Sequence, residues 1–233
     1  GVLSGVVQEG YAFGFLLAAA VYFLVFPHFG WRAMFFIGGL PALLTLFIRS
    51  RVQETTAWKA AKTTSWKEYG QVVTKHWKLF LYLVLLMAAM NLISHGTQDL
   101  YPTFLQQQLH YSPRITAAVT MVSMAGAIFG GMLFGYLSDV WGRKKMMALA
   151  IILAIVLIPL WLHAGGIAIV MAGAFGMQFM VQGAWGVIPA HINELSPGAL
   201  RGFFPGFAYQ LGVLIASGVA YVEAAMAQSL SYA

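Results

Sequence analysis

Seven long apolar stretches constrain the fold of this chain more than any other feature of its sequence. They run over residues 4–26, 31–49, 79–104, 115–138, 146–163, 166–188 and 203–225. Each is close to the roughly 20 residues with which an α-helix crosses the hydrocarbon core of a bilayer. Only 9% of the residues are charged, whereas soluble domains carry about 25%. No segment shows the alternation typical of barrel strands. The sequence therefore predicts an all-α polytopic membrane protein.

The distribution of positive charge predicts the orientation of these helices. Eleven of the thirteen Lys and Arg residues follow the second, fourth and sixth stretches, and the other two are Arg32 and Arg114. Cytoplasmic loops carry an excess of cations, so these three segments are expected in the cytoplasm. We expect a multi-pass protein of the inner (plasma) membrane with the lipid bilayer as a partner. The net charge of +6 then marks topology and not a nucleic-acid partner.

The segment 51–78 is the one long polar region and suggests a division of the chain. Its tryptophans are interleaved with lysines, which is typical of an amphipathic helix on lipid headgroups. We interpret it as a cytoplasmic linker between two helical bundles. Residues 1–50 are then the last two helices of an N-terminal bundle, and residues 79–233 belong to a C-terminal bundle.

A weak internal repeat supports this division. Residues 1–5 (GVLSG) resemble residues 202–206 (GFFPG), and the Gln8/Gly10 pair recurs as Gln210 and Gly212. Transporters built from two six-helix halves repeat in this way. A repeat of about 200 residues implies about 400 for the whole protein. We therefore expect this chain to cover about helices 5 to 11 of twelve, without helix 12.

The loop after the fourth stretch reads GYLSDVWGRKK. It resembles the G-x-L-x-D-x-x-G-R-K signature of the major facilitator superfamily, with a valine where the family often has a basic residue. Small residues allow two helices to approach closely, and the aspartate can accept from the arginine. The resemblance implies a cytoplasmic gate, and a simple basic stop with a tight turn remains the alternative. The motif residues are Gly135, Asp139, Gly142, Arg143 and Lys144.

The third stretch carries an unusual set of polar residues, NLISHGTQDLYPT. At 100° per residue Asn91, His95 and Asp99 share one face of a helix. Ser94 and Gln98 flank that face. Polar side chains inside a membrane span are costly unless they face a water-filled path. Pro102 removes a backbone donor, so a kink or break is expected near it. The polar residues concerned are Asn91, Ser94, His95, Gln98, Asp99 and Thr103.

This segment resembles the N-x-x-S/T-H-x-x-Q-D motif of the lactate and pyruvate permeases in the sialate:proton symporter family. The match includes the trailing Thr103, and the run from Gly183 to Pro197 is also similar. The resemblance implies that the motif helix lines a substrate path. His95 and Asp99, one turn apart, form a candidate proton site, and protonated His95 is a donor for a substrate carboxylate. A polar ladder that only joins helices is the alternative.

Five further positions are candidates for a functional or interfacial role. Gln178, Gln182 and Trp185 recur at i, i+4 and i+7 in the sixth stretch, where they either contact a small polar substrate or join helices. Glu9 lies unusually deep in the first stretch and is either a proton relay or the partner of a cation elsewhere. Glu223 is expected to be interfacial. The chain has no cysteine, and we predict no metal and no cofactor besides the coupling proton.

The favoured function is proton-coupled symport of a short monocarboxylate, such as lactate or pyruvate, by a carrier that is monomeric when full length. No Arg or Lys lies in the interior of a stretch, so a fixed counter-charge for the substrate must be His95 or lie elsewhere. A symporter of sialic acid or another organic anion is the alternative within this fold. An intramembrane enzyme or a transporter-derived sensor is the alternative from another class. The sequence disfavours an enzyme because it contains neither H-E-x-x-H nor G-x-S-x-G.

Overall fold

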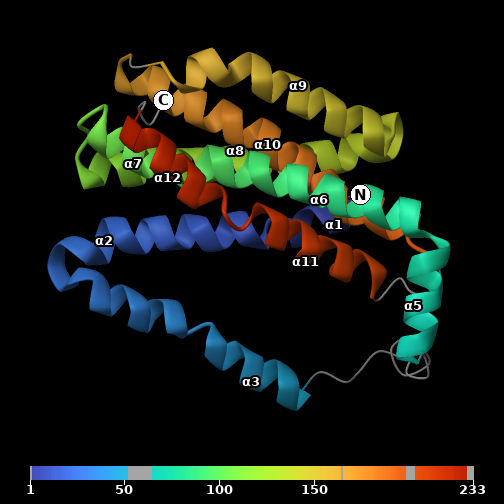
Figure 1. The fold of residues 1–233 in the computed structure, drawn as a ribbon. Coiled ribbons are helices and arrows are strands. Elements are labelled where there is room, and N and C mark those ends of the chain that lie inside the picture. The colour runs from blue at the N-terminus through green and yellow to red at the C-terminus, as the bar shows by residue number, and fades with distance from the viewer. Residues whose placement is uncertain (1, 52–64, 164, 198–202, 230–233) are drawn as a thin grey trace.

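The computed structural model describes residues 2–51, 65–163, 165–197 and 203–229. Within these ranges every regular element is an α-helix (Figure 1). The helices are α1 (Val2–Gln8), α2 (Gly10–Gly39), α3 (Ala42–Arg51), α5 (Trp66–Lys75), α6 (Trp77–Gln98), α7 (Tyr101–Gln107), α8 (Pro113–Trp141), α9 (Arg143–Trp161), α10 (Ile167–Leu195), α11 (Phe204–Ala216) and α12 (Val219–Ser229). The predicted all-helical fold class is confirmed.

Six stretches of the described chain are long and apolar enough to cross a membrane. They are Gly5–Arg51, Trp77–Gln107, Pro113–Trp141, Arg143–Trp161, Ile167–Leu195 and Phe204–Ala227. The first joins two of the seven stretches expected from the sequence. A straight helix of its 47 residues would be about 70 Å long, more than twice the hydrocarbon thickness. It is broken at Gly30, whose φ of 68° and ψ of −174° are not helical, and the ribbon turns back within α2 (Figure 1).

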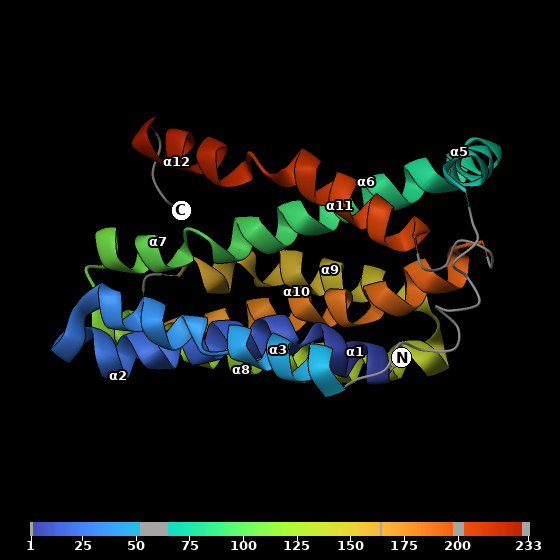
Figure 2. The same ribbon diagram turned by 90° about the horizontal axis from the view of Figure 1, so that it is seen from below.

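The helices pack side by side around α8 and α10. Figure 2 shows α11 and α12 beside α6 on one side and α1 and α2 beside α8 on the other, with α9 and α10 between. Gly126 and Gly130 of α8 bring the backbones of α8 and α10 together, because a Cβ on either would meet the backbone of Phe175 or Phe179. Small residues at membrane helix contacts permit this approach. By contrast, residues 35–51 are exposed throughout.

The ends of the helices follow from local chemistry. The Ser112 side chain caps α8 by accepting from the backbone N–H of Ile115 at 3.3 Å. Gly142, with a φ of 96°, makes the turn from α8 to α9 that residues with a Cβ rarely adopt. Between α6 and α7 the helix is interrupted at Asp99 and Leu100, and Pro102 lies in the first turn of α7. The break expected near Pro102 is therefore confirmed.

The α8–α9 junction, α5 and the start of α6 lie at one end of the molecule (Figure 1). This is the end at which the cation distribution predicts the cytoplasm. Of the expected linker, residues 52–64 lie outside the described residues, as does Arg201. The α5 helix lies within the linker range. The division into bundles at residues 50 and 79 stays a prediction.

Candidate functional site

A polar cavity of about 70 Å³ lies where α6, α10, α11 and the α1–α2 region meet. By volume it has room for a few water molecules or a comparably small solute. Five of its residues come from the sequence-based candidates, and three do not. The lining residues are Gln8, Tyr11, Asn91, Ser94, His95, Gln182, Trp185 and Tyr209.

The polar face of α6 divides into a buried stripe and a more accessible edge. Asn91, Ser94 and Gln98 are 4%, 7% and 5% exposed. The side chains of His95 and Asp99 are 37% and 31% exposed, and His95 Nδ1 lies 3.1 Å from Asp99 Oδ2. The structure thus forms the expected pair one turn apart. Only His95 of the two lines the cavity.

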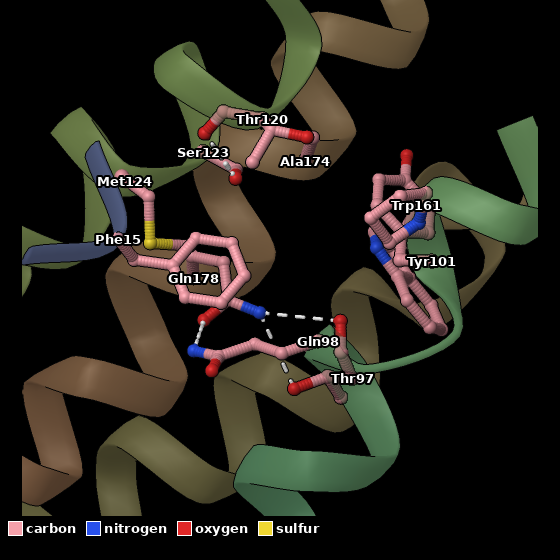
Figure 3. A pocket seen from close by; sticks show the side chains of 11 residues that line it. Phe15, Thr97, Gln98, Tyr101, Thr120, Ser123, Met124, Trp161, Ala174 and Gln178 are labelled. Atoms are coloured by element: carbon pink, nitrogen blue, oxygen red, sulfur yellow. Dashed lines mark hydrogen bonds between the residues drawn. The ribbon is translucent and has the colours of Figure 1, made fainter. Parts of the chain in front are cut away.

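Next to the cavity, a hydrogen-bonded cluster joins α6 to α10 (Figure 3). Gln98 Nε2 donates to Gln178 Oε1 at 2.7 Å, and Gln178 Nε2 donates to the carbonyl oxygen and Oγ1 of Thr97, each at 3.3 Å. Tyr11 donates its hydroxyl proton to Gln98 Oε1 at 3.2 Å. The space among these groups is about 10 Å³, no more than one water needs. Gln98 and Gln178 therefore join α6 to α10, and their place in a substrate path stays a prediction.

Within the cavity wall, several groups remain able to hold a solute. Gln182 Nε2 makes only a long 3.5 Å hydrogen bond to Ser94 Oγ. Trp185 Nε1 is buried and has no acceptor among the described residues. His95 is the one imidazole in the lining, and no Lys or Arg of the described chain joins it. Neutral donors around one imidazole suit a small solute that carries a single carboxylate.

The remaining candidates lie away from this cavity. Thr103 is half-buried on α7 and lines neither polar pocket. Glu223 of α12 packs against α6, because a Cβ on Gly96 would lie 3.0 Å from Glu223 Oε1. Among the described residues no group of His, Asp and Glu is arranged to hold a metal ion. The cavity residues that sequence reasoning missed are Gln8, Tyr11 and Tyr209. Only Gln8 carried a signal, through the Gln/Gly repeat.

A second polar cluster joins three helices at the predicted cytoplasmic end. Arg143 Nη1 lies 2.6 Å from Asp139 Oδ1, and Arg143 Nη2 lies 2.7 Å from Glu194 Oε1. Arg143 Nη1 also donates to Ser138 Oγ at 2.7 Å. One guanidinium thus connects α8, α9 and α10. The Asp139–Arg143 pair was expected, and the part played by Glu194 was not. Of the other motif residues, Gly135 is buried and Lys144 is exposed.

Comparison with known protein families identifies the class of protein to which these membrane-spanning helices belong. The family profile described as Major Facilitator Superfamily matches residues 1–221. The chain belongs to the Major Facilitator Superfamily. The names of its curated relatives are those of transporters, which is consistent with a multi-pass helical membrane protein.

Three curated relatives illustrate the kinds of transporter that the chain resembles. A carboxylic acid transporter protein homolog of Saccharomyces cerevisiae is 32% identical over 97% of this chain and 41% of its own length. The sialic acid transporter NanX of Escherichia coli is 27% identical over 90% of this chain and 52% of its own length. A cis,cis-muconate transport protein of Acinetobacter baylyi is 24% identical over 90% of this chain and 53% of its own length. The chain spans about half the length of the curated relatives it matches.

Proposed function

We propose that this protein is a secondary active transporter that carries a short monocarboxylate, such as lactate or pyruvate, together with a proton across the inner membrane. The observation that carries the proposal is the polar cavity built on His95. It is a small, mostly uncharged pocket inside apolar helices, with one imidazole in its wall. Polar groups within spans are costly and mark substrate paths. The similarity to a carboxylic acid transporter homolog supports the same substrate class.

The roles of the residues follow from their geometry. Protonated His95 donates to the substrate carboxylate, while Asp99, 3.1 Å away, orients the imidazole and takes part in proton uptake. Gln182 and Trp185 supply neutral donors from the opposite helix, α10. An anion and a proton that enter together add no net charge to the cavity. Coupling then follows because the carboxylate binds well only when His95 is protonated.

The position of the cavity suits alternating access. Its wall combines α1 and α2 with α6, α10 and α11, and sites in two-bundle carriers lie at the interface of the repeats. We propose that residues 1–50 and 79–233 belong to the two bundles, that 51–78 link them in the cytoplasm, and that the full-length protein works as a monomer. Rocking of one bundle against the other would expose the cavity to each side in turn.

The volume of the cavity suits a short acid. At about 70 Å³, it is smaller than the roughly 300 Å³ at the lower end of pockets for drug-sized ligands, whereas a cavity lined in part by Phe15, Pro102 and Thr120 measures about 340 Å³. A sialic acid, with its nine-carbon skeleton, belongs to that larger class. The observation in favour of the alternative is the similarity to the sialic acid transporter NanX. An organic-anion symporter of wider specificity is therefore the second candidate.

Transport by the full-length protein in proteoliposomes tests the proposal. Radiolabelled lactate should accumulate inside when the outside is acidic, and collapse of the pH gradient should abolish accumulation. Unlabelled pyruvate should compete, whereas sialic acid and betaine should not. Empty liposomes provide the baseline. Lack of lactate uptake together with pH-driven uptake of sialic acid would decide for the second candidate.

A further inference from the structure

Glu9 is the most deeply buried carboxylate of the described chain and takes no part in the cavity. It is 1% exposed, at the junction of α1 and α2. Neither of its carboxyl oxygens has a hydrogen-bond partner among the described residues. The backbone of Glu9 is hydrogen-bonded, because its N–H donates to Gly5 O at 3.0 Å. Only the side-chain carboxyl of this residue is therefore left without a partner in the described chain.

The carboxyl of Glu9 fills a hollow that a glycine provides. A Cβ placed on Gly131 of α8 would overlap Glu9 Oε1, and its three nearest neighbours would all be Glu9 atoms. Gly5 and Gly186 close the same region, because a Cβ on either would contact the carbonyl oxygen of Gly131. Three helices, α1, α8 and α10, thus meet at three glycines. Only a backbone without side chains leaves space here for a carboxyl group.

Among the described residues of α1, α2, α8 and α10, no charged group pairs with Glu9. The nearest titratable residues along α2, α8 and α10 are Tyr11, Tyr136 and His191. Tyr11 donates to Gln98, and Tyr136 is 55% exposed on the outside of α8. His191 lies 3.2 Å from the hydroxyl of Tyr82. Gly131 is ten residues from the end of α8, or about 15 Å from the predicted cytoplasmic end.

We propose that Glu9 is the proton-linked latch of this carrier: its neutral carboxyl closes the contact of α1 and α2 with α8 and α10, and proton loss to the cytoplasm opens it. The proposal rests on the proposed proton coupling and adds the site from which the proton leaves. An isolated carboxylate in an apolar contact is unfavourable, so the closed contact holds the neutral form. A carboxylate needs water, which reaches Glu9 only if the helices separate.

The direction of the linkage follows from this geometry. The closed contact binds one more proton than the open one, so acid favours closure and alkali favours opening. The alkaline cytoplasm would open the inner side of a loaded carrier and release the proton there. The proton taken up at the His95–Asp99 pair then passes, through the water that the opening admits, to the emptied Glu9 carboxylate. One proton thus leaves to the cytoplasm in each cycle, and the contact can close again. In a one-proton linkage the ratio of open to closed forms changes about tenfold per pH unit.

A cysteine at Ala127 reports on this contact without any substrate. Ala127 is fully buried in the cluster that includes Ala12 of α2, one turn from Gly131 on α8. In the full-length protein with this as its only cysteine, a thiol reagent is added from the cytoplasmic side at pH 5 to 9. The labelling rate is divided by the labelling rate of the same protein carrying Glu9→Gln. Because the thiol titrates in both proteins, its own titration cancels in this ratio. The ratio should rise up to tenfold per pH unit, and Glu223→Gln should leave that rise unchanged.

A ratio that stays constant within twofold over this range would overturn the proposal. Packing is tested separately by Gly131→Ala, which should lower the melting temperature because its methyl group meets Glu9, and by Glu9→Ala/Gly131→Ala, which should restore it. Equal melting temperatures for the single and double variants would show that Glu9 does not occupy the hollow. Absence of lactate uptake would overturn the proposed substrate and leave the labelling result to decide on the latch.

Discussion

Two contacts between helices bury polar side chains in opposite ways. One is the contact of α6 with α10, and the other is the contact of α1 and α2 with α8. The first brings amides and hydroxyls together, and Gln98, Gln178 and Thr97 satisfy one another at 2.7–3.3 Å. The second places a single carboxyl among glycines with no partner in the described chain. Buried polar groups that satisfy each other hold helices in place. A buried polar group without a partner is costly and indicates a working role.

The largest effect on transport is expected from a change to Asp99, which lies on the accessible edge of α6 and belongs to neither contact. Asp99→Asn in the full-length protein should abolish accumulation of lactate driven by a pH gradient, because the group that takes part in proton uptake is gone. Exchange of labelled for unlabelled lactate should persist, since it needs no net proton movement. Both are measured in proteoliposomes. If this variant still accumulated lactate fully, the His95–Asp99 pair would have only a structural role, like the hydrogen bonds between α6 and α10.

His95→Ala tests whether the imidazole holds the substrate. Loss of a hydrogen bond to a charged group costs about 1.5–3 kcal/mol, which corresponds to a rise of roughly tenfold to a hundredfold in the apparent KM for lactate. Leu92→Ala is the control, because Leu92 lies off the polar face and is 43% exposed. An unchanged KM in the His95 variant would remove the imidazole from the binding site.

Gln178→Leu tests the contact of α6 with α10, in which the polar groups are hydrogen-bonded to one another. It removes the acceptor for Gln98 and both contacts to Thr97, and hydrogen bonds between membrane helices contribute about 0.6–1.7 kcal/mol. Thermal unfolding in detergent should show this loss of stability, with the KM for lactate changed less than threefold. Gln107→Leu, an exposed glutamine on α7, is the matched control. A large rise in KM without loss of stability would make Gln178 a substrate ligand.

The smallest effect is expected for Arg143→Ala at the predicted cytoplasmic end. Its partners Asp139 and Glu194 are 39% and 55% exposed, and pairs in such settings contribute about 0.2–1 kcal/mol each. Labelling of the cysteine at position 127 should therefore rise only severalfold at constant pH. Lys145→Ala, which changes a neighbouring exposed cation, should have no effect. A collapse of folding in the Arg143 variant would show that the cluster is structural.

The sequence was sufficient for the features that depend on one helix at a time. Apolar length predicted the spans, Pro102 predicted the break after α6, and the spacing of Asp139 and Arg143 predicted their ion pair. Contacts between distant segments were beyond it. Tyr11 bonds to Gln98 across 87 positions, and Glu194 joins Arg143 across 51. Such pairs depend on the rotation of each helix about its axis, which glycines such as Gly131 help to set and no local pattern records.

The same limit explains why the candidate site was only partly foreseen. Asn91, Ser94, His95, Gln182 and Trp185 stood out as polar or aromatic groups at helical spacing, and they line one cavity. Gln98 and Gln178 stood out equally but pair with each other. Tyr209 and Tyr11 complete the wall without any sequence signal, since tyrosines are frequent in membrane helices. Spacing finds polar faces, and only the packed structure separates open polar groups from satisfied ones.

The turn at Gly30 has a consequence for how the protein enters the membrane. A reversal within Gly5–Arg51 makes this stretch an inserted hairpin, so that the chain returns to the side on which it began. If the same residues crossed only once, every later helix would point the other way. The cation clusters after α3 and α8 would then face away from the cytoplasm, against the charge bias that guides insertion. One residue with a φ of 68° thus fixes the parity of the crossings, and with it the side of the membrane on which every later loop is expected.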